Sequence, residues 1–419
     1  MWNCTEKNDQ RFAGKESTLK TRVKLFACQA LILGMVVTQS YAQQTPPQVS
    51  APKPPASTSP QPVPKSPEVD KAGMVTFRIY APTATEVKLQ AEGNEATPGM
   101  TSEKMNANPG GIPMIKAGNG VWSYTLGPIQ PGVYRYNFVV DGAAVADPRN
   151  PASSETLNAV KSMYEVPGAA FLEYGKDVPH GAIAVVRYPS AVLNELRRMH
   201  VYTPTGYEGD AKRYPVLYLL HGGGDSDDSW ATIGRAGAIL DNLIAEHKAV
   251  PMMIVMPAGH ISRTMSFDLN TMGHDKFNAD LTDSIVPFVD QHYRTLADRQ
   301  NRAIAGLSMG GLQTLTISLT RSDLFAYVGI FSSGWFPQTR EQVERTDLAT
   351  YKSSGKPFAL YWVNAGKLDI AYENSNSTIE LLKTYGIKPD THTSEGFHAW
   401  NNWREYLRTF APLLFRAEQ

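Results

Sequence analysis

A serine flanked by glycines stands out in the segment GLSMGG at residues 306–311. It follows an apolar stretch typical of a buried strand and precedes a helical pattern, the setting in which a G-x-S-x-G sequence forms a sharp turn. The glycines avoid collisions with neighbouring backbone, and the helix amino end directs unpaired N–H groups toward a developing oxyanion. We therefore predict that Ser308 is a nucleophile for carbonyl chemistry.

A serine hydroxyl needs a base, and hydrolases with this motif place the partners in the chain order serine, acid, histidine. Two histidines follow the motif. His392 lies in a predicted strand over residues 390–395, whereas His398 lies in the segment GFHAW, directly before a predicted helix over residues 401–415. We favour His398, because a loop between the last strand and the last helix is the expected position of the base.

Three aspartates are candidates for the acid. Asp369 follows an apolar strand predicted at residues 358–366, Asp323 lies in a turn at a helix end, and Asp390 begins the strand that carries the other histidine. We favour Asp369, because the acid belongs at the end of an earlier strand. It would hold the imidazole tautomer and stabilise the imidazolium without taking the proton.

An oxyanion hole requires two donors. The backbone N–H of Met309, which follows the nucleophile, is the first candidate. The second is expected in the segment HGGGD at residues 221–225, which follows a buried strand and resembles the HGGG pattern of hydrolases. Gly223 is the predicted donor and Gly224 the alternative, and Gly224 is also expected to contact substrate.

Three tryptophans near these segments are expected to bind a flat aromatic or sugar substrate by stacking: Trp230, Trp335 and Trp400. Packing in the core is the alternative for each. The histidines outside the proposed triad show no ligand spacing, so no metal and no cofactor are predicted.

The chain divides into two regions with different sequence patterns. Short alternating strands between residues 70 and 168, such as MVTFRIYAP at 74–82, predict an immunoglobulin-like antiparallel β-sandwich. From residue 169 to 419 apolar strands alternate with helical segments, which predicts a doubly wound α/β domain with its site at the carboxyl ends of the strands.

The amino-terminal region resembles a targeting segment. Basic residues precede an apolar run and a small-x-small site, so residues 1–42 are expected to be a secretory signal cleaved after Ala42, with a membrane anchor as the alternative. Residues 43–69 predict a disordered proline-rich spacer. Both cysteines, Cys4 and Cys28, fall in the signal, so the mature chain is expected to lack thiols and to be secreted or periplasmic, without a membrane association.

Forty basic residues balance forty acidic ones. Such a balance argues against nucleic acid or an anionic membrane surface as partner. A neutral or weakly charged substrate is expected, and the sequence does not determine the oligomeric state.

The runs YPVLYLLHGGGDSDDSW, RAIAGLSMGGLQTL and GFHAWNNWR resemble the esterase family of α/β-hydrolases that includes feruloyl and acetyl-xylan esterases. The resemblance covers roughly residues 180–415 and implies the α/β-hydrolase fold, with Ser308, Asp369 and His398 as the triad. The segments VTFRIYAP and VYRYNFVVDG are similar to the early-set, glycogen-binding-like module that often precedes such esterases.

The resemblance implies hydrolysis of a small-molecule ester or of feruloylated or acetylated xylan, with feruloyl ester hydrolysis as the leading hypothesis. Acetyl-xylan esterase and siderophore esterase are alternatives within the same chemistry. Acyl transfer to sugar and non-catalytic glycan binding are alternatives of other classes. Deleting residues 43–168 is expected to spare hydrolysis of small soluble esters and to weaken action on polymer, whereas loss of folding would show that the sandwich is structural.

Overall fold

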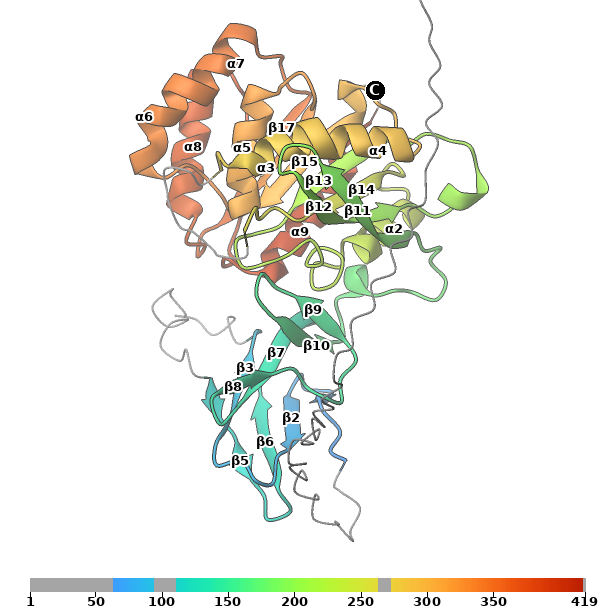
Figure 1. Cartoon of the computed structure of the whole chain (residues 1–419), viewed down its shortest axis with the longest axis vertical. Coiled ribbons are helices and arrows are strands. Elements are labelled where there is room, and N and C mark those ends of the chain that lie inside the picture. Colours follow the sequence, from blue (N-terminus) through green and yellow to red (C-terminus); the bar gives the residue numbers. More distant parts are fainter. Residues whose placement is uncertain (1–62, 94–110, 263–272, 417–419) are drawn as a thin grey trace, which may run out of the picture. The chain divides into compact units, whose positions relative to one another are not determined.

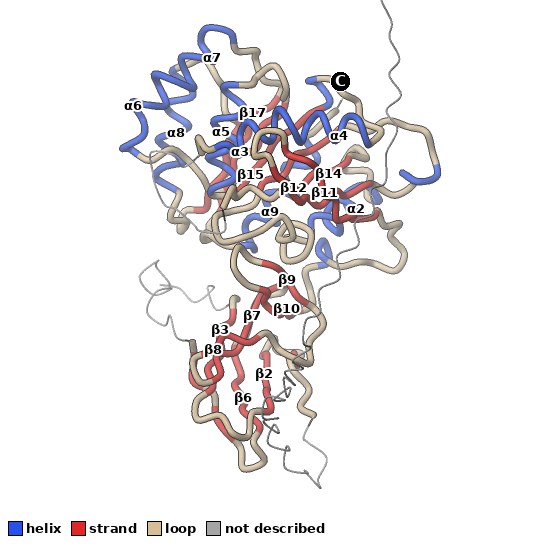
Figure 2. Tube along the Cα trace, viewed as in Figure 1, coloured by secondary structure: helices blue, strands red, loops and turns tan. Residues whose placement is uncertain are grey.

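The computed structural model describes residues 63–93, 111–262 and 273–416 (Figure 1). The predicted signal at residues 1–42, and residues 43–62 of the predicted spacer, lie outside the described residues. All described residues belong to one compact unit within Gln61–Gln419. Figure 2 shows an all-β region followed by a region in which strands and helices alternate, as the sequence predicts. Among the described residues, no helix has both the length and the apolar character needed to span a bilayer.

The all-β region is a sandwich of two antiparallel sheets. The smaller sheet has the order β1 (Glu68–Val69), β2 (Val75–Tyr80), β6 (Val121–Leu126) and β5 (Ile115–Lys116). The larger has the order β4 (Ile112–Pro113), β3 (Val87–Ala91), β7 (Gly132–Val140), β10 (Val160–Val166) and β9 (Ser153–Glu155), with β8 (Ala143–Val145) paired to β7. The predicted spacer ended at residue 69, but its last two residues pair with β2, so the sheet begins at Glu68.

Alternation along the strands builds the sandwich core. In β2 every second residue is buried, and Val75, Phe77 and Ile79 pack against Tyr136 and Phe138 of β7 in one cluster. This arrangement is what a period of two residues dictates when one face of each sheet meets the other.

The α/β region is organised around one eight-stranded sheet. Its order is β11 (Ala182–Ser190), β12 (Glu195–Thr203), β14 (Met253–Pro257), β13 (Val216–Leu220), β15 (Arg302–Leu307), β16 (Tyr327–Phe331), β17 (Leu360–Gly366) and β18 (Asp390–Ser394). The pairs β11–β12 and β12–β14 are antiparallel, and all later pairs are parallel. The carboxyl ends of the parallel strands therefore lie along one edge, where the candidate site was predicted.

Helices cover both faces of this sheet (Figure 1). Val216, Tyr218 and Leu220 of β13 pack in the core on one face, and Leu217 and Leu219 pack in the core on the other. The first face is covered by helices that include α3 (Lys276–Asp280), α4 (Val286–His292), α5 (Met309–Thr320) and α8 (Tyr372–Thr384). The second is covered by α2 (Ala236–Ala245) and α9 (Trp400–Phe410). The α/β-hydrolase prediction is confirmed.

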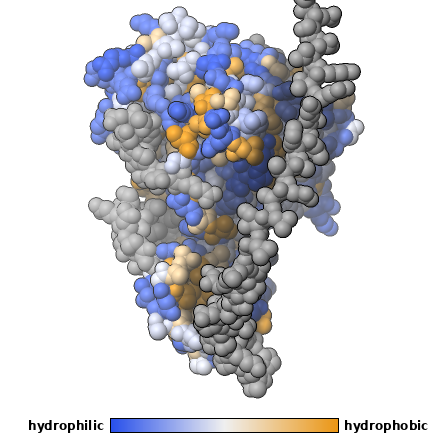
Figure 3. Space-filling model, in the orientation of Figure 1, coloured by the Kyte–Doolittle hydropathy of each residue, from blue (hydrophilic) through white to orange (hydrophobic). Residues whose placement is uncertain are grey.

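The described residues also form shorter helical segments. They are α6 (Arg340–Val343), α7 (Ala349–Ser354), the π-helical turns η4 (Leu281–Ile285) and η7 (Glu344–Leu348), and the 3₁₀ turns η2 (Ala170–Leu172), η3 (Tyr207–Gly209), η5 (Arg299–Asn301), η6 (Pro337–Thr339) and η8 (Ala411–Leu413). On the face drawn in Figure 3 hydrophilic residues predominate and apolar residues gather only in small patches.

Candidate active site

Ser308 occupies a strained turn between β15 and α5. Its backbone angles are φ 52° and ψ −115°, a combination that side-chain-bearing residues rarely adopt. Strain of this kind costs about 1–3 kcal/mol and persists only where the surroundings enforce it. A Cβ at Gly306 would lie 2.2 Å from the Gly310 carbonyl oxygen, and a Cβ at Gly310 would lie 2.6 Å from that of His221. The glycines of the motif are therefore required by close backbone contacts.

The three predicted triad residues meet in space. His398 Nε2 lies 3.0 Å from Ser308 Oγ, and His398 Nδ1 lies 2.8 Å from Asp369 Oδ1. A carboxylate can only accept, so Nδ1 carries the proton and Nε2 is left to accept the serine proton. Asp369 Oδ1 also accepts from the backbone N–H of Ala371 at 2.8 Å, and its side chain is fully buried. The arrangement can generate a nucleophilic hydroxyl.

The other candidates for base and acid lie elsewhere. His392 is exposed on β18 and does not line the pocket that contains Ser308. Asp323 pairs with Arg321, and Asp390 is an exposed residue at the start of β18. The structure therefore brings together Ser308, His398 and Asp369, the residues favoured on chain position, and leaves the other candidates elsewhere.

The predicted oxyanion donors are the N–H of Met309, which directly follows Ser308, and the N–H of Gly223 in the loop after β13. Met309 is the first residue of α5, so its N–H has no acceptor within the helix. In the loop after β13, His221 accepts from Gly259 N–H at its Nε2 and therefore donates from Nδ1 to the Gly222 carbonyl at 2.8 Å. Burial lowers the pKa of His221, which keeps this tautomer neutral. Gly223 and Gly224 both line the pocket with Ser308.

The pocket around Ser308 has a volume of 340 Å³, within the range of small-molecule sites. The α/β region contributes Ser308, His398, the glycine loop and residues of α9. The sandwich contributes a polar wall that sequence analysis did not anticipate: Glu92, Tyr134, Arg135, Thr156 and Lys161.

Only one of the three predicted substrate-binding tryptophans lines this pocket, and that is Trp400. Trp230 is 1% exposed, packs in the core with α2 and α9, and donates from Nε1 to the Leu220 carbonyl at 3.1 Å. Trp335 packs in the core on the opposite face of the sheet. We therefore correct the prediction for Trp230 and Trp335, whose large apolar rings contribute to packing.

Trp403 lines the pocket and was not predicted. It lies one helical turn after Trp400 on α9, and its ring meets that of His398 edge to face at 5.1 Å between centroids. The spacing of three residues on one helix face is the sequence signal that could have identified it.

Contacts between the sandwich and the α/β region surround the site. Asn401 Nδ2 donates to the Tyr134 hydroxyl at 3.2 Å, and Arg404 donates to the Val133 carbonyl at 2.8 Å. The expectation that the sandwich can be deleted without effect on small esters assumed that it is separate from the site. That assumption is wrong, because sandwich residues form part of the pocket wall.

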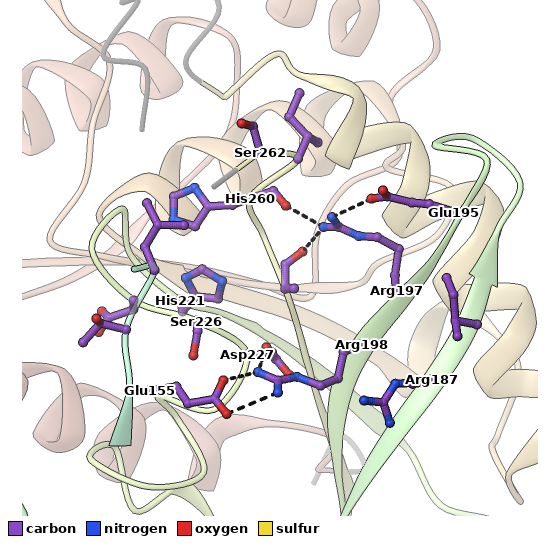
Figure 4. Close-up of a pocket in the computed structure, with 16 residues that line it drawn as sticks. Glu155, Arg187, Glu195, Arg197, Arg198, His221, Ser226, Asp227, His260 and Ser262 are labelled. Carbon is purple, nitrogen blue, oxygen red and sulfur yellow. Dashed lines mark hydrogen bonds and ion pairs between the residues drawn. The ribbon is translucent and has the colours of Figure 1, made fainter. Parts of the chain in front are cut away.

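A second cavity, of 490 Å³, shares Thr156 and Asp225 with the first (Figure 4). Arg198 bridges two carboxylates here, that of Glu155 in the sandwich and that of Asp227 after the glycine loop. Burial by itself raises the pKa of Asp227, but hydrogen bonds from His200 and Arg198 outweigh it and lower the pKa to about 2. This carboxylate is therefore charged at neutral pH and can hold the arginine.

Comparison with known proteins finds a family match within the α/β region. The sequence model of the family described as "Putative esterase" matches residues 190–413. An endo-1,4-β-xylanase/feruloyl esterase of Xylanibacter ruminicola is 34% identical over 369 residues, 85% of this chain and 47% of the relative. Endo-1,4-β-xylanase Y of Acetivibrio thermocellus is 27% identical over 66% of this chain and 27% of its own length. The chain thus spans less than half the length of these relatives.

Solved structures agree in fold. A ferulic acid esterase of Anaeromyces mucronatus matches 59% of this chain and 96% of its own, with a TM-score of 0.53 and 26% identity. The enterobactin esterase of Shigella flexneri matches 81% of this chain and 92% of its own, with a TM-score of 0.56 and 21% identity. This second match shows a shared fold.

Proposed function

Because the chain belongs to this esterase family and is a carboxylesterase, we propose that it hydrolyses feruloyl esters of plant xylan, with Ser308 as the nucleophile. The observation that carries the catalytic assignment is the pair of contacts, 3.0 Å and 2.8 Å, that link Ser308 to His398 and His398 to Asp369. Each contact is within the range for proton transfer or for orientation of a base.

In the proposed acylation, Ser308 Oγ attacks the ester carbonyl while His398 Nε2 takes its proton. The N–H groups of Met309 and Gly223 stabilise the oxyanion, and Asp369 stabilises the imidazolium. Collapse of the tetrahedral intermediate breaks the bond to the alcohol, which leaves with the proton from His398. Water then attacks the acyl-serine with the same base, and the acid is released.

The pocket supports an aromatic acyl group on a sugar. Trp400 and Trp403 line the pocket, and the 7% of each residue that is exposed is where a flat acyl group can make contact. Glu92, Lys161 and Asn401 offer donors and acceptors for sugar hydroxyls on the same pocket wall. The relative named as a xylanase and feruloyl esterase, which aligns with 85% of this chain, is the second line of support.

The proposal includes export, to the periplasm or the exterior, since the substrate is a polymer of the plant cell wall. Its support is the basic, apolar and small-residue pattern that ends at Ala42. Sequencing the amino terminus of the protein recovered outside the cytoplasm of its host tests it, with a start at residue 43 expected. A protein retained with residues 20–42 would contradict it.

A paired assay tests the substrate. Purified protein is incubated with methyl ferulate and with acetylated xylan, and released ferulate and acetate are measured by chromatography. We expect ferulate release that is lost in Ser308→Ala. Turnover of acetyl esters alone would overturn the substrate assignment, and turnover that survives Ser308→Ala would overturn the nucleophile.

A matched pair of histidine variants tests the base. His398→Ala is expected to lose activity to the level of Ser308→Ala, whereas His392→Ala, at an exposed position of β18, keeps wild-type activity. The reverse result would assign the base to His392.

A further inference from the structure

Arg135 of the sandwich enters the α/β region as a buried cation. It lies on β7, is 3% exposed, and donates to Asp225 Oδ1 at 2.7 Å. Its remaining nitrogens donate to Ser154 Oγ at 2.9 and 3.1 Å, to Ser229 Oγ at 2.8 Å and to the Glu155 carbonyl at 3.1 Å. A planar guanidinium with every nitrogen engaged fixes the position of its partners.

Asp225, which accepts a hydrogen bond from Arg135, is the last residue of the glycine loop at residues 221–225. The loop closes as a turn in which Asp225 N–H donates to the Gly222 carbonyl at 3.1 Å. Between these residues lie only Gly223 and Gly224, and glycine has the greatest backbone freedom of any residue. A loop of this composition adopts a single conformation only if contacts with residues outside the loop restrict it.

The sandwich and the α/β region both supply such contacts. Arg135 holds the Asp225 side chain, and the Leu157 backbone N–H donates to the Gly224 carbonyl at 3.2 Å. From the α/β region, the His221 ring holds the Gly222 carbonyl. In a trans peptide the N–H points opposite to the C=O, so a fixed Gly222 carbonyl fixes the direction of the Gly223 N–H.

We propose that Arg135 is a positioning residue that holds the glycine loop, through Asp225, in the conformation that presents the Gly223 N–H to the oxyanion. The inference rests on the proposed function, since it concerns the same site. It makes the sandwich a part of the catalytic apparatus, acting on the transition state and not only on polymer binding.

The chain offers a control for a purely structural ion pair between the two regions. Arg235 at the start of α2 pairs with Glu165 of β10 at 2.6 Å, and neither residue lines the pocket with Ser308. Glu165→Gln removes this pair at the same boundary without touching the glycine loop. An effect seen in Arg135 variants but not in Glu165→Gln is therefore specific to the loop.

The test compares Arg135→Gln, Asp225→Ala, their double variant and Glu165→Gln. For each, active sites are titrated to completion with a fluorophosphonate, and kcat and KM are measured on a soluble chromogenic ester. We expect kcat per titrated site to fall about 10- to 100-fold, less than the 10²–10³-fold cost of losing a donor outright, with KM changed by less than about twofold. The double variant should resemble the single ones, since both residues act through one contact.

Inhibition provides a readout that stability does not affect. A boronic acid forms a tetrahedral adduct on Ser308 and needs the oxyanion donors, whereas the alcohol product does not. The inhibition constant for the boronate should rise in parallel with the loss of kcat, and that for the product should stay constant. Glu165→Gln should match wild type in all of these measurements.

The inference is overturned if Asp225→Ala and Arg135→Gln keep kcat and boronate affinity within about twofold of wild type. Should Arg135→Gln fail to fold, Asp225→Ala decides alone, because it removes this acceptor and leaves the other acceptors of Arg135 in place. A wild-type protein that hydrolyses no ester would instead overturn the proposed function, so the two failures are distinct.

Discussion

The environment of Asp369 makes an unusual prediction for the Asp369→Asn variant. In serine hydrolases generally, amidation of the triad acid costs about 10⁴-fold in kcat, because the histidine is held in the wrong tautomer. Here Asp369 Oδ1 accepts from both the Ala371 N–H and His398 Nδ1. An asparagine that turned its NH₂ group toward this position would oppose the Ala371 N–H with another donor. The amide oxygen should therefore stay in place and preserve the tautomer.

Only the charge of the acid is then lost. An imidazolium and a carboxylate about 4 Å apart attract by about 4 kcal/mol at an effective dielectric constant of about 20. At about 1.4 kcal/mol per tenfold in rate, this is about 10³-fold, and we expect kcat to fall by about 10²–10³-fold. The new NH₂ would take the place of Oδ2, which has no hydrogen-bond partner among the described residues, so stability should also fall by about 1–3 kcal/mol.

Steady-state kinetics of Asp369→Asn on a chromogenic ester measure this loss, with Asp390→Asn as the exposed acid control. A decrease of 10⁴-fold or more, equal to that of Ser308→Ala, would show that the asparagine reverses the tautomer and refute the argument from Ala371. A decrease below about tenfold would show that Asp369 is not the acid.

Three further predictions follow from packing and charge. Gly310→Ala should lower kcat at least about tenfold and lower the melting temperature, because the new Cβ would lie 2.6 Å from the His221 carbonyl oxygen, and an unchanged kcat would contradict this. Trp230→Phe should lower the free energy of unfolding by about 1–3 kcal/mol, because it removes the hydrogen bond to the Leu220 carbonyl. Denaturant titration measures this loss, and a changed KM would show instead that Trp230 contacts the substrate. Burial lowers the pKa of His260 to about 4, below the value near 6.5 of an unfolded chain, so the unfolded state binds more protons and stability falls as the pH falls from about 6.5 to 4. Thermal denaturation of wild type and His260→Gln across this range should show the steeper loss in wild type, and equal losses would contradict it.

Local sequence predicts much of this fold because the signals are local. The buried strands β13, β14, β15, β16 and β17 appear as apolar runs, and the turn after β15 carries its glycines within six residues. Chain order leaves two histidines as candidates for the base, and strand position favours Asp369 among the three aspartates proposed for the acid. Geometry selects the pair, His398 and Asp369, that was favoured on position.

The sequence does not predict contacts between residues that are far apart in the chain. Arg135 and Asp225 are 90 positions apart, and nothing near either residue indicates the other. Trp230 shows the complementary difficulty, since an aromatic residue after the glycine loop can face the pocket or the core. Only the packing of α2 and α9 against the sheet places it inside.

The most direct test of the account is to trap its covalent intermediate. The protein is mixed with methyl ferulate, quenched with acid during turnover, digested, and the peptides are examined by mass spectrometry. The account predicts a feruloyl group on the peptide that contains Ser308, absent from Ser308→Ala and accumulated when deacylation is slowed. Turnover with an acyl group on a different residue, or a feruloyl adduct that persists in Ser308→Ala, would contradict it.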